Sequence, residues 1–401
     1  MENWPGFAIP RGFKAAGVAC GIKASGNLDV AMLVSDHPCT AAGTFTLNRV
    51  AAAPVQWDRA LVPGHGLRGV VINAGNANAA TGQQGLQNAE KMAEMAAEKM
   101  GCSDRQVLVA STGVIGHQLP MDKLQKGIDM AAAGLSAGVE AFQAASRAIM
   151  TTDTVPKVAG TTITTANGET VHILGLCKGA AMIGPRMATM LAFILTDAKV
   201  GEEFLQQYLS EAVDDSFNCV SVEGHASTND TVLVLANGQA NNAALAGDDL
   251  AMFRQALRDV CEELAKMIPG DGEGATHRIT IDVTGCVDRA EAMAIARSVA
   301  DSPLVKTAIH GADPNWGRIV SAAGYAGIDF QETEMCLKLN GFPLYHKGVP
   351  LVFDAAKVSA NIRDNRETHI ELVFTRGSSS IRFWTCDLTA EYIHLNADYT
   401  T

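Results

Sequence analysis

The chain has 401 residues, of which 47% are hydrophobic, 18% are charged and only 5% are aromatic, and its formal net charge is -12. This composition supports a large buried core and excludes a disordered chain. A negatively charged protein repels phosphate backbones, and no run of Lys and Arg offsets the charge here, so we expect no nucleic-acid binding.

Alternating strand and helix signals along the chain predict an α/β or α+β enzyme. In the first half we expect strands at 30–35, 69–74, 107–110, 161–165, 171–176 and 189–195, and helices at 86–100, 121–133 and 139–149. In the second half we expect helices at 202–215, 248–267 and 290–300, and strands at 231–236, 278–284, 333–339, 369–374, 380–384 and 392–396. Pro269-Gly270 should end the long helix, and 237–247 reads as a surface loop.

Several classes of site lack their usual signatures. The nine cysteines occur singly without a CxxC pair, which argues against zinc and disulfide frameworks and indicates reduced thiols. The ten histidines have no metal-ligand spacing, so we expect no metal. The N-terminus lacks a signal-peptide pattern, and the most apolar stretch, 179–196, contains Pro185 and Arg186. We therefore expect a cytoplasmic protein that does not enter a membrane.

A lone hydroxyl stands at the start of an apolar strand, where Thr189 follows the small residue Ala188. Thr often begins strands, so this position has a plain structural explanation. The functional alternative is attack of the Thr189 hydroxyl on the Ala188 carbonyl, followed by an N→O acyl shift and hydrolysis. Thr189 would then become a new N-terminus whose α-amino group serves as general base for its own hydroxyl.

Other polar, glycine-containing segments interrupt apolar sequence. ASTGVIG ends a predicted strand, where Thr112 and Gly113 can direct a hydroxyl and a backbone N–H at an oxyanion, or simply form a turn. MTTDTVPK (150–157) and DGEGAT (271–276) offer hydroxyls and acids for an amino-acid substrate, or are solvated turns. Lys178 can pair with a substrate carboxylate, or point to solvent.

Taken in order, these segments resemble the glutamate N-acetyltransferase family, also called ornithine acetyltransferases. The shared motifs extend from Gly12-Phe13 to the C-terminus: NAGNANAATG, ASTGVIG, IMTTDTVPK, KGAAMIGPRMATMLAF, STNDTVLVLANG, DGEGAT, HGADPNWGRI and CDLTAEYIHLNADYTT. The resemblance implies that Thr189 is both the cleavage point and the nucleophile, and that Thr112 and Gly113 form the oxyanion hole. It also implies substrate-binding positions, namely Thr152, Lys178, Thr189, Glu273, Asn396 and Thr401.

The fold implied by the resemblance is an α/β sandwich with stacked β-sheets, in the style of N-terminal nucleophile enzymes. Cleavage between Ala188 and Thr189 would give an α chain of residues 1–188 and a β chain of residues 189–401, usually as an α2β2 assembly. The C-terminal tail should fold into the active site. The implied reaction is a ping-pong transfer of acetyl from N-acetylornithine to glutamate without a cofactor. Some members also use acetyl-CoA, and the sequence leaves open whether this chain does.

Two departures from the family pattern stand out. The family commonly has His-Pro-Asn where this chain has Gly184-Pro185-Arg186, and an acidic residue near the position of His225. We still expect cleavage because the Pro, Met, Ala and Thr of the motif remain. Two rival hypotheses stay open: a hydrolase that passes the acyl group from Thr189 to water, and an uncleaved paralogue without catalytic activity.

Overall fold

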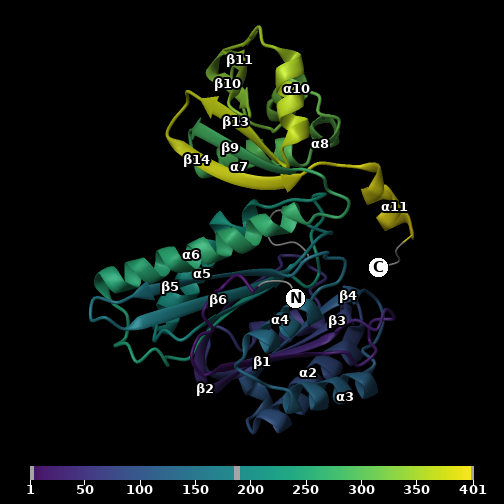
Figure 1. Ribbon diagram of the computed structural model, residues 1–401, viewed down its shortest axis with the longest axis vertical. Helices are drawn as coiled ribbons and strands as arrows, with labels where there is room; N and C mark the ends of the chain where they lie inside the picture. Colours follow the sequence, from purple (N-terminus) through teal and green to yellow (C-terminus); the bar gives the residue numbers. More distant parts are fainter. Residues whose placement is uncertain (1–3, 185–189, 399–401) are drawn as a thin grey trace.

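The computed structural model describes residues 4–184 and 190–398 and has two lobes (Figure 1). The larger lobe holds an eight-stranded sheet with the order β4-β3-β2-β8-β7-β6-β5, and β1 pairs with β2 beside this path. Its strands are β1 (Phe13–Val18), β2 (Val30–Phe45), β3 (Gly64–Asn76), β4 (Val107–Val114), β5 (Lys157–Thr164), β6 (Thr170–Lys178), β7 (Leu191–Thr196) and β8 (Thr231–Ala236).

The strand order interleaves the two halves of the sequence. β7 and β8 pair in parallel with each other, whereas β8 pairs antiparallel with β2 and β7 pairs antiparallel with β6. The two strands that follow residue 189 are therefore flanked on both sides by strands that precede it.

The eight-stranded sheet bends at β2, where the pairing with β3 shifts between Val34 and Cys39, and its two halves face each other. The alternation of side chains shows this packing. Leu33 of β2, Ile72 of β3 and Leu108 of β4 share one buried cluster with Leu176 of β6 and Phe193 of β7. The predicted stacking of β-sheets in an α/β sandwich is confirmed within this lobe.

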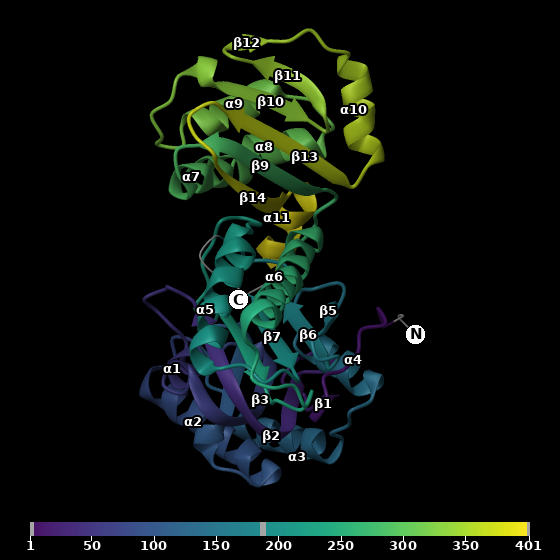
Figure 2. The same cartoon turned by 90° about the vertical axis from the view of Figure 1, so that its left-hand side faces the viewer.

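Helices cover the outer faces of the two sheet halves (Figures 1 and 2). Helices α2 and α3 pack on the half that contains β3 and β4, and α5 and α6 on the half that contains β6 and β7. The helices of this lobe are α1 (Ala53–Arg59), α2 (Gly82–Met100), α3 (Met121–Ala133), α4 (Val139–Ala148), α5 (Glu202–Asp215) and α6 (Gly247–Gly270). Short 3-10 turns occupy Asp104–Gln106 and Phe217–Cys219.

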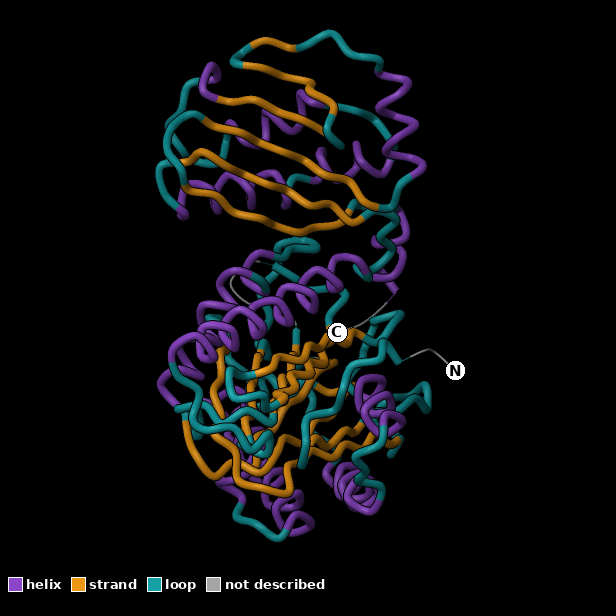
Figure 3. Tube along the Cα trace, turned by 60° about the vertical axis from the view of Figure 1, so that its left-hand side comes forward, coloured by secondary structure: helices purple, strands orange, loops and turns teal. Residues whose placement is uncertain are grey.

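The smaller lobe is built on a six-stranded sheet with the order β12-β11-β10-β13-β9-β14 (Figure 3). Its strands are β9 (Arg278–Cys286), β10 (Met335–Leu339), β11 (Phe342–His346), β12 (Val349–Pro350), β13 (Glu367–Phe374) and β14 (Ser379–Cys386). Its helices are α7 (Arg289–Ala300), α8 (Pro303–His310), α9 (Trp316–Gly324) and α10 (Ala355–Asp364), with a 3-10 turn at Glu332–Glu334. The Ser221 N–H donates to the Trp384 carbonyl at 3.0 Å and joins the lobes.

Helix α11 (Ala390–Asp398) follows β14 and runs from the small lobe toward the large one (Figure 1). The expected strand at 392–396 is therefore wrong. The Thr389 hydroxyl accepts the Tyr392 N–H at 3.3 Å and caps the first turn, and no strand lies beside this segment among the residues described. A helix supplies the backbone partners that an isolated strand would lack.

Most other expected elements are confirmed, with bounds that differ by a few residues. Strand β7 begins at Leu191 and all six of its residues are buried, as expected for a strand covered on both faces. Helix α6 continues through Pro269 to Gly270, so Pro269, which has no backbone N–H to donate, stands in the last turn and does not end the helix before it. Helices α8, α9 and α10 lie in the part of the chain that we expected to be mostly strands.

Candidate active site

The predicted catalytic and binding motifs meet at one edge of the bent sheet. β3 and β4 run parallel, so both arrive there at their carboxyl ends, and Thr112 and Gly113 lie near the end of β4. β6 ends at Lys178, which pairs with Leu191 at the start of the antiparallel β7. Asn229 joins the two halves of the sheet, because its side-chain amide donates to the carbonyls of Ala77 at 2.6 Å and Ser111 at 2.9 Å.

Lys178 is buried and reaches across this edge. Its Nζ donates to the Thr112 hydroxyl at 3.3 Å, which joins the predicted oxyanion position to a predicted substrate-binding position. Burial lowers the pKa of the Lys178 ammonium and is opposed by the nearby carboxylates of Asp153, Asp230 and Glu273. Lys178 is thus held inside the protein at the mouth of the sheet and is not a solvated lysine.

Gly113 occupies a backbone conformation that favours glycine, with φ of 130°. A Cβ at this position would lie 2.4 Å from the carbonyl carbon of Gly75 on the neighbouring β3. The close approach of these two backbones fixes the direction of the N–H groups around Thr112. This is the rigid geometry that an oxyanion hole requires.

We expect Gly113→Ala to lower the free energy of unfolding by about 1–3 kcal/mol, because the added methyl group overlaps β3. If Gly113 shapes an oxyanion hole, the rate of acyl transfer should also fall by about 100-fold. Urea unfolding and steady-state kinetics measure the two effects. Gly116→Ala is the matched control, since Gly116 has φ of 85° but no atom within 4 Å of an added Cβ. Equal effects of the two substitutions would contradict the role of close packing.

Two loops near this edge are joined by a buried ion network. Lys157 Nζ lies 2.7 Å from Asp153 Oδ1 and 2.6 Å from Asp271 Oδ2. Asp153 also accepts the Gly179 N–H at 2.6 Å, and Asp271 accepts the Thr154 N–H at 3.0 Å. The sequence left open whether the acids of DGEGAT meet an amino-acid substrate or form a solvated turn, and the Asp271 side chain is buried and not in a solvated turn. Asp271 is paired with Lys157 inside the protein.

The pKa values within this network follow from burial and charge. Burial opposes ionisation of Asp153, but the ammonium groups of Lys178 and Lys157 outweigh it and hold the pKa of Asp153 well below its usual range. Burial likewise opposes the charged form of Lys157, and the carboxylates of Asp153 and Asp271 outweigh it and raise its pKa. These shifts favour the charged forms of Asp153 and Lys157. The network fixes the loop that contains Thr152, which is half-buried.

Glu273 brings the C-terminal helix to the same region. The Glu273 N–H donates at 3.0 Å to the carbonyl of Ala180, two residues after Lys178. The side-chain amide of Asn396 on α11 donates to Glu273 Oε2 at 2.7 Å. A Cβ at Gly274 would lie 2.7 Å from the Tyr392 nitrogen, so the loop and the helix are tightly packed. Up to residue 398, the C-terminal tail therefore lies against the loop that contains Glu273.

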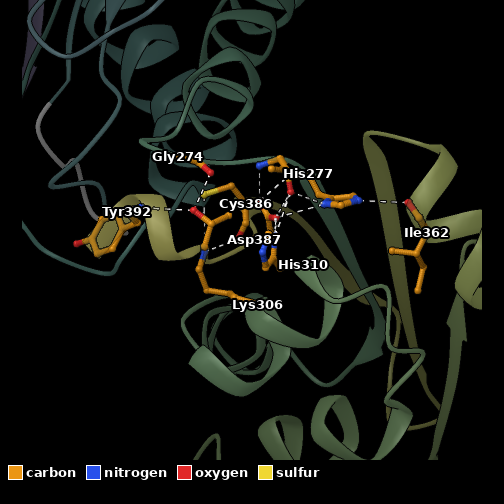
Figure 4. Close-up of polar contacts among 10 residues, drawn as sticks. Gly274, His277, Lys306, His310, Ile362, Cys386, Asp387 and Tyr392 are labelled. Carbon is orange, nitrogen blue, oxygen red and sulfur yellow. Dashed lines mark hydrogen bonds and ion pairs between the residues drawn. The ribbon is translucent and has the colours of Figure 1, made fainter. Parts of the chain in front are cut away.

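One carboxylate holds both the Glu273 loop and the segment that leads into α11 (Figure 4). Asp387 Oδ1 accepts the Thr276 N–H at 2.8 Å and the His277 N–H at 2.9 Å. Its Oδ2 lies 3.2 Å from the Nδ1 atoms of His277 and His310. Burial opposes ionisation of Asp387, but hydrogen bonds from the Thr276 hydroxyl, from the His277 and Thr276 N–H groups and from the His277 ring outweigh it and lower the pKa of Asp387. The sequence alone did not indicate that Asp387, in the motif CDLTAEYIHLNADYTT, anchors these segments.

Met190, the residue before β7, forms hydrogen bonds through both its N–H and its carbonyl. The Met190 N–H donates to Asp230 Oδ1 at 3.1 Å, and the Met190 carbonyl accepts the Thr231 N–H at 3.2 Å. Thr189 and Ala188, together with Pro185, Arg186 and Thr401, lie outside the described residues. The structure therefore defines the residue after Thr189 and not Thr189 itself.

Comparisons with known proteins identify the family of this chain. The model of the ArgJ family matches residues 14–401. The chain belongs to the ArgJ family. Two relatives carry the name arginine biosynthesis bifunctional protein ArgJ: that of Rhodopirellula baltica is 44% identical over 98% of this chain and 96% of its own length, and that of Dehalococcoides mccartyi is 46% identical over the same shares. A solved ArgJ structure from Bacillus halodurans is 38% identical with a TM-score of 0.50, covering 52% of this chain and 98% of its own.

A pocket of about 730 Å³ opens beside the edge where the ArgJ-family motifs meet. It is lined mainly by the 22–28 segment and by the 150–156 segment, which includes Thr151 and Asp153, with Gly75 of β3, Val114 at the end of β4 and Arg147 beside them. Its position next to the Asp153–Lys157 network gives small molecules access to this part of the lobe.

In this ArgJ-family chain Gly184, which stands where the family commonly has His, packs closely against Gly224. A Cβ at Gly184 would lie 2.6 Å from the carbonyl carbon of Gly224, so a His at this position does not fit the observed contact. His225 is the next residue and is exposed. The two departures from the family pattern are thus neighbours in space.

Asp230 is fully buried in this ArgJ-family chain, and its Oδ2 has no hydrogen-bond partner within the described ranges. Burial raises the pKa of this carboxyl to about 8, against the opposing effects of the Met190 N–H, the hydroxyls of Thr46 and Ser227, and the Lys178 ammonium. Because the folded value lies above the ordinary value of 3.8, the unfolded state loses its proton first as pH rises.

We therefore expect Asp230→Asn to make the protein less sensitive to alkaline pH. Between pH 4 and about 8, the wild type should lose stability relative to the variant by on the order of 1 kcal/mol per pH unit. The amide keeps an oxygen that accepts the Met190 N–H. Urea unfolding at several pH values measures the difference, and parallel curves for the two proteins would contradict the prediction.

No helix in the described ranges is long and apolar enough to cross a membrane. Among the same residues, no group of three or more His, Cys, Asp and Glu side chains is arranged to hold a metal ion. All nine cysteines are free thiols.

Proposed function

We propose that this chain is cut between Ala188 and Thr189 and that it transfers acetyl groups in arginine biosynthesis. Thr189 takes the acetyl group from N-acetylornithine, ornithine leaves, and glutamate then accepts the acetyl group to give N-acetylglutamate. Thr112 and Gly113 stabilise the oxyanion, and Thr152, Lys178, Glu273, Asn396 and Thr401 bind the substrates. The relatives named as arginine biosynthesis proteins support the pathway.

The observation that carries the proposal is the meeting of Thr112, Gly113 and Lys178 at the start of β7. Thr189 precedes Leu191, the first residue of that strand, by only two positions in the chain. The nucleophile is therefore tied by covalent bonds to the place where the cation and the oxyanion donors converge.

The length of the solved Bacillus halodurans chain also supports a cut. That chain covers 52% of this one while 98% of it is matched. Residues 189–401 number 213 of 401, or 53%, so the solved chain has the length of the proposed β fragment.

We further propose that the fragments 1–188 and 189–401 stay together as an α2β2 assembly in the cytoplasm, with N-acetylornithine and glutamate as small-molecule partners. Acetyl-CoA is the second acetyl donor to test, since the relatives are named bifunctional. The free thiols are compatible with a reducing compartment.

The intact mass of the purified protein under denaturing conditions tests the cut. Two fragments whose masses sum to 42.1 kDa plus one water, the second beginning at Thr189, support the proposal. A single chain of 42.1 kDa would favour the uncleaved paralogue. Acetyl transfer from N-acetylornithine is then measured with and without glutamate. Release of acetate without the acceptor, at the rate seen with it, would favour the hydrolase.

A further inference from the structure

A second carboxylate lies beside Glu273 and belongs to a segment with unusual backbone bonding. The N–H groups of Val222, Glu223 and Gly224 all donate to the single carbonyl of Ile183, at 2.8, 3.2 and 3.0 Å. Val222 also lies 3.5 Å from the position of a Cβ on Gly272. This bonding holds Glu223 between the loop that follows β6 and the loop that carries Glu273.

Among the described residues, no oppositely charged side chain directly contacts the Glu223 carboxyl. Both carboxylate oxygens are shielded from solvent, and neither has a hydrogen-bond partner within residues 4–184 and 190–398. Buried polar groups in native proteins are normally paired, and an unpaired carboxyl near a binding site points to a partner that arrives with the ligand. The two Glu223 oxygens can therefore form hydrogen bonds with a bound ligand.

Charged and titratable groups on four segments interact with Glu223. Glu273 lies on the loop after α6, Lys306 on α8, Cys386 at the end of β14 and Tyr392 on α11. Lys306 is already engaged, since its Nζ donates to the Thr385 hydroxyl at 3.0 Å and to the Cys386 carbonyl (Figure 4). Glu223 thus faces one carboxylate and no uncommitted cation in this set.

Burial raises the pKa of Glu223 to about 8. The nearby backbone N–H groups of Ile183 and His225 and the Lys306 ammonium oppose the shift, and the Glu273 carboxylate adds to it. Near neutral pH the free protein therefore carries Glu223 mainly in its neutral form. A neutral carboxyl both donates and accepts hydrogen bonds, whereas an ionised carboxylate only accepts.

We propose that Glu223, together with Glu273, contacts the side-chain end of both amino-acid substrates and distinguishes the cationic donor from the anionic acceptor. The inference rests on the proposed function, in which one site binds N-acetylornithine and glutamate in turn. The donor carries an ammonium at its side-chain end, and the acceptor carries a carboxylate there. A site with fixed charge would favour only one of them.

The proton balance of this recognition is simple. When the ornithine ammonium binds, the Glu223 carboxyl releases its proton to solvent and the resulting carboxylate pairs with the ammonium. When the glutamate side chain binds, Glu223 keeps its proton and donates it as a hydrogen bond to the incoming carboxylate. Donor binding is thus linked to proton release, and acceptor binding is not.

Calorimetric titration of the wild-type protein tests the linkage, with ornithine and glutamate as the probes because neither can acetylate the enzyme. Each titration is run near pH 7 in two buffers of different ionisation enthalpy. We expect the protein to release about one proton when ornithine binds and about none when glutamate binds. Equal proton release for the two ligands would overturn the inference. If the wild type binds neither ligand, the proposed function fails, and the inference fails with it.

The Glu223→Gln variant tests the same residue kinetically, because its amide donates to a carboxylate but cannot ionise. We expect the KM for N-acetylornithine to rise about 10-fold or more, and the KM for glutamate to change by less than about 3-fold. Glu90→Gln, on the exposed face of α2, is the control and should leave both values unchanged. A uniform change in both KM values would contradict a role in distinguishing substrates. If the variant is not cut or folded, the calorimetry of the wild type decides.

Discussion

The Thr189→Ala chain is expected to remain a single species of 42.1 kDa and to have no measurable acetyl transfer. Without the hydroxyl there is no attack on the Ala188 carbonyl, and therefore no free amino group at residue 189. Nucleophile and base are lost together, so the rate should fall by at least about 1,000-fold. Intact mass and transfer from N-acetylornithine to glutamate measure the two consequences.

Thr189→Ser is the matched variant, because it keeps the hydroxyl and removes only a methyl group. It should still be cut and should retain part of the activity. If the alanine variant is cut at the same position, or transfers acetyl at the wild-type rate, the proposed role of the Thr189 hydroxyl is wrong. Loss of both properties in the serine variant would indicate instead that the methyl group is needed for packing.

The Lys157→Met variant is expected to lose about 3–5 kcal/mol of unfolding free energy. Lys157 contacts Asp153 at 2.7 Å and Asp271 at 2.6 Å, and all three side chains are buried. Removing the Lys157 ammonium leaves the buried carboxylates of Asp153 and Asp271 without their counter-ion. The resulting loss of unfolding free energy is larger than the stabilisation that the complete ion network provides. Urea unfolding measures the loss, and activity should fall as well because the network holds the Thr152 loop.

Lys91→Met is the control, since Lys91 contacts Glu94 at 2.8 Å but its side chain is 60% exposed. It should leave stability unchanged, because exposed ion pairs contribute little. Adding Asp271→Asn to Lys157→Met removes one of the two carboxylates that lack a counter-ion. The double variant should regain part of the unfolding free energy that Lys157→Met loses. Similar unfolding curves for the Lys157 and Lys91 variants would show that the buried network is not what stabilises the loops.

The sequence predicted the elements whose pattern is local. The wholly apolar run of β7 and the periodic apolar face of α2 identify a strand and a helix without any knowledge of their neighbours. Helices α8, α9 and α10 were missed although their starts carry signals. Ser302, Asn315 and Asp354 each accept a backbone N–H of the first turn. Short helices have few apolar repeats, so capping residues were the better indicator.

The candidate site was predictable to the extent that motifs alone define it. The resemblance named Thr112, Gly113, Lys178, Glu273 and Asn396, and the structure brings each of these near another of the group. It did not indicate that Asp271 pairs with Lys157, since 114 positions separate them in the chain. Asp230, Asp387 and Glu223 were missed for the same reason. Their importance comes from burial and partners, which depend on packing between distant segments.

The order of the eight-stranded sheet has a consequence for a protein cut before residue 189. β7 and β8 would belong to the second fragment, yet β2 and β6 of the first fragment bond to their outer sides. Removing the second fragment would split the sheet down its middle and leave two unpaired strand edges, a state that invites aggregation. The cut protein should therefore melt in one transition, and its fragments should regain structure only when they refold in each other's presence.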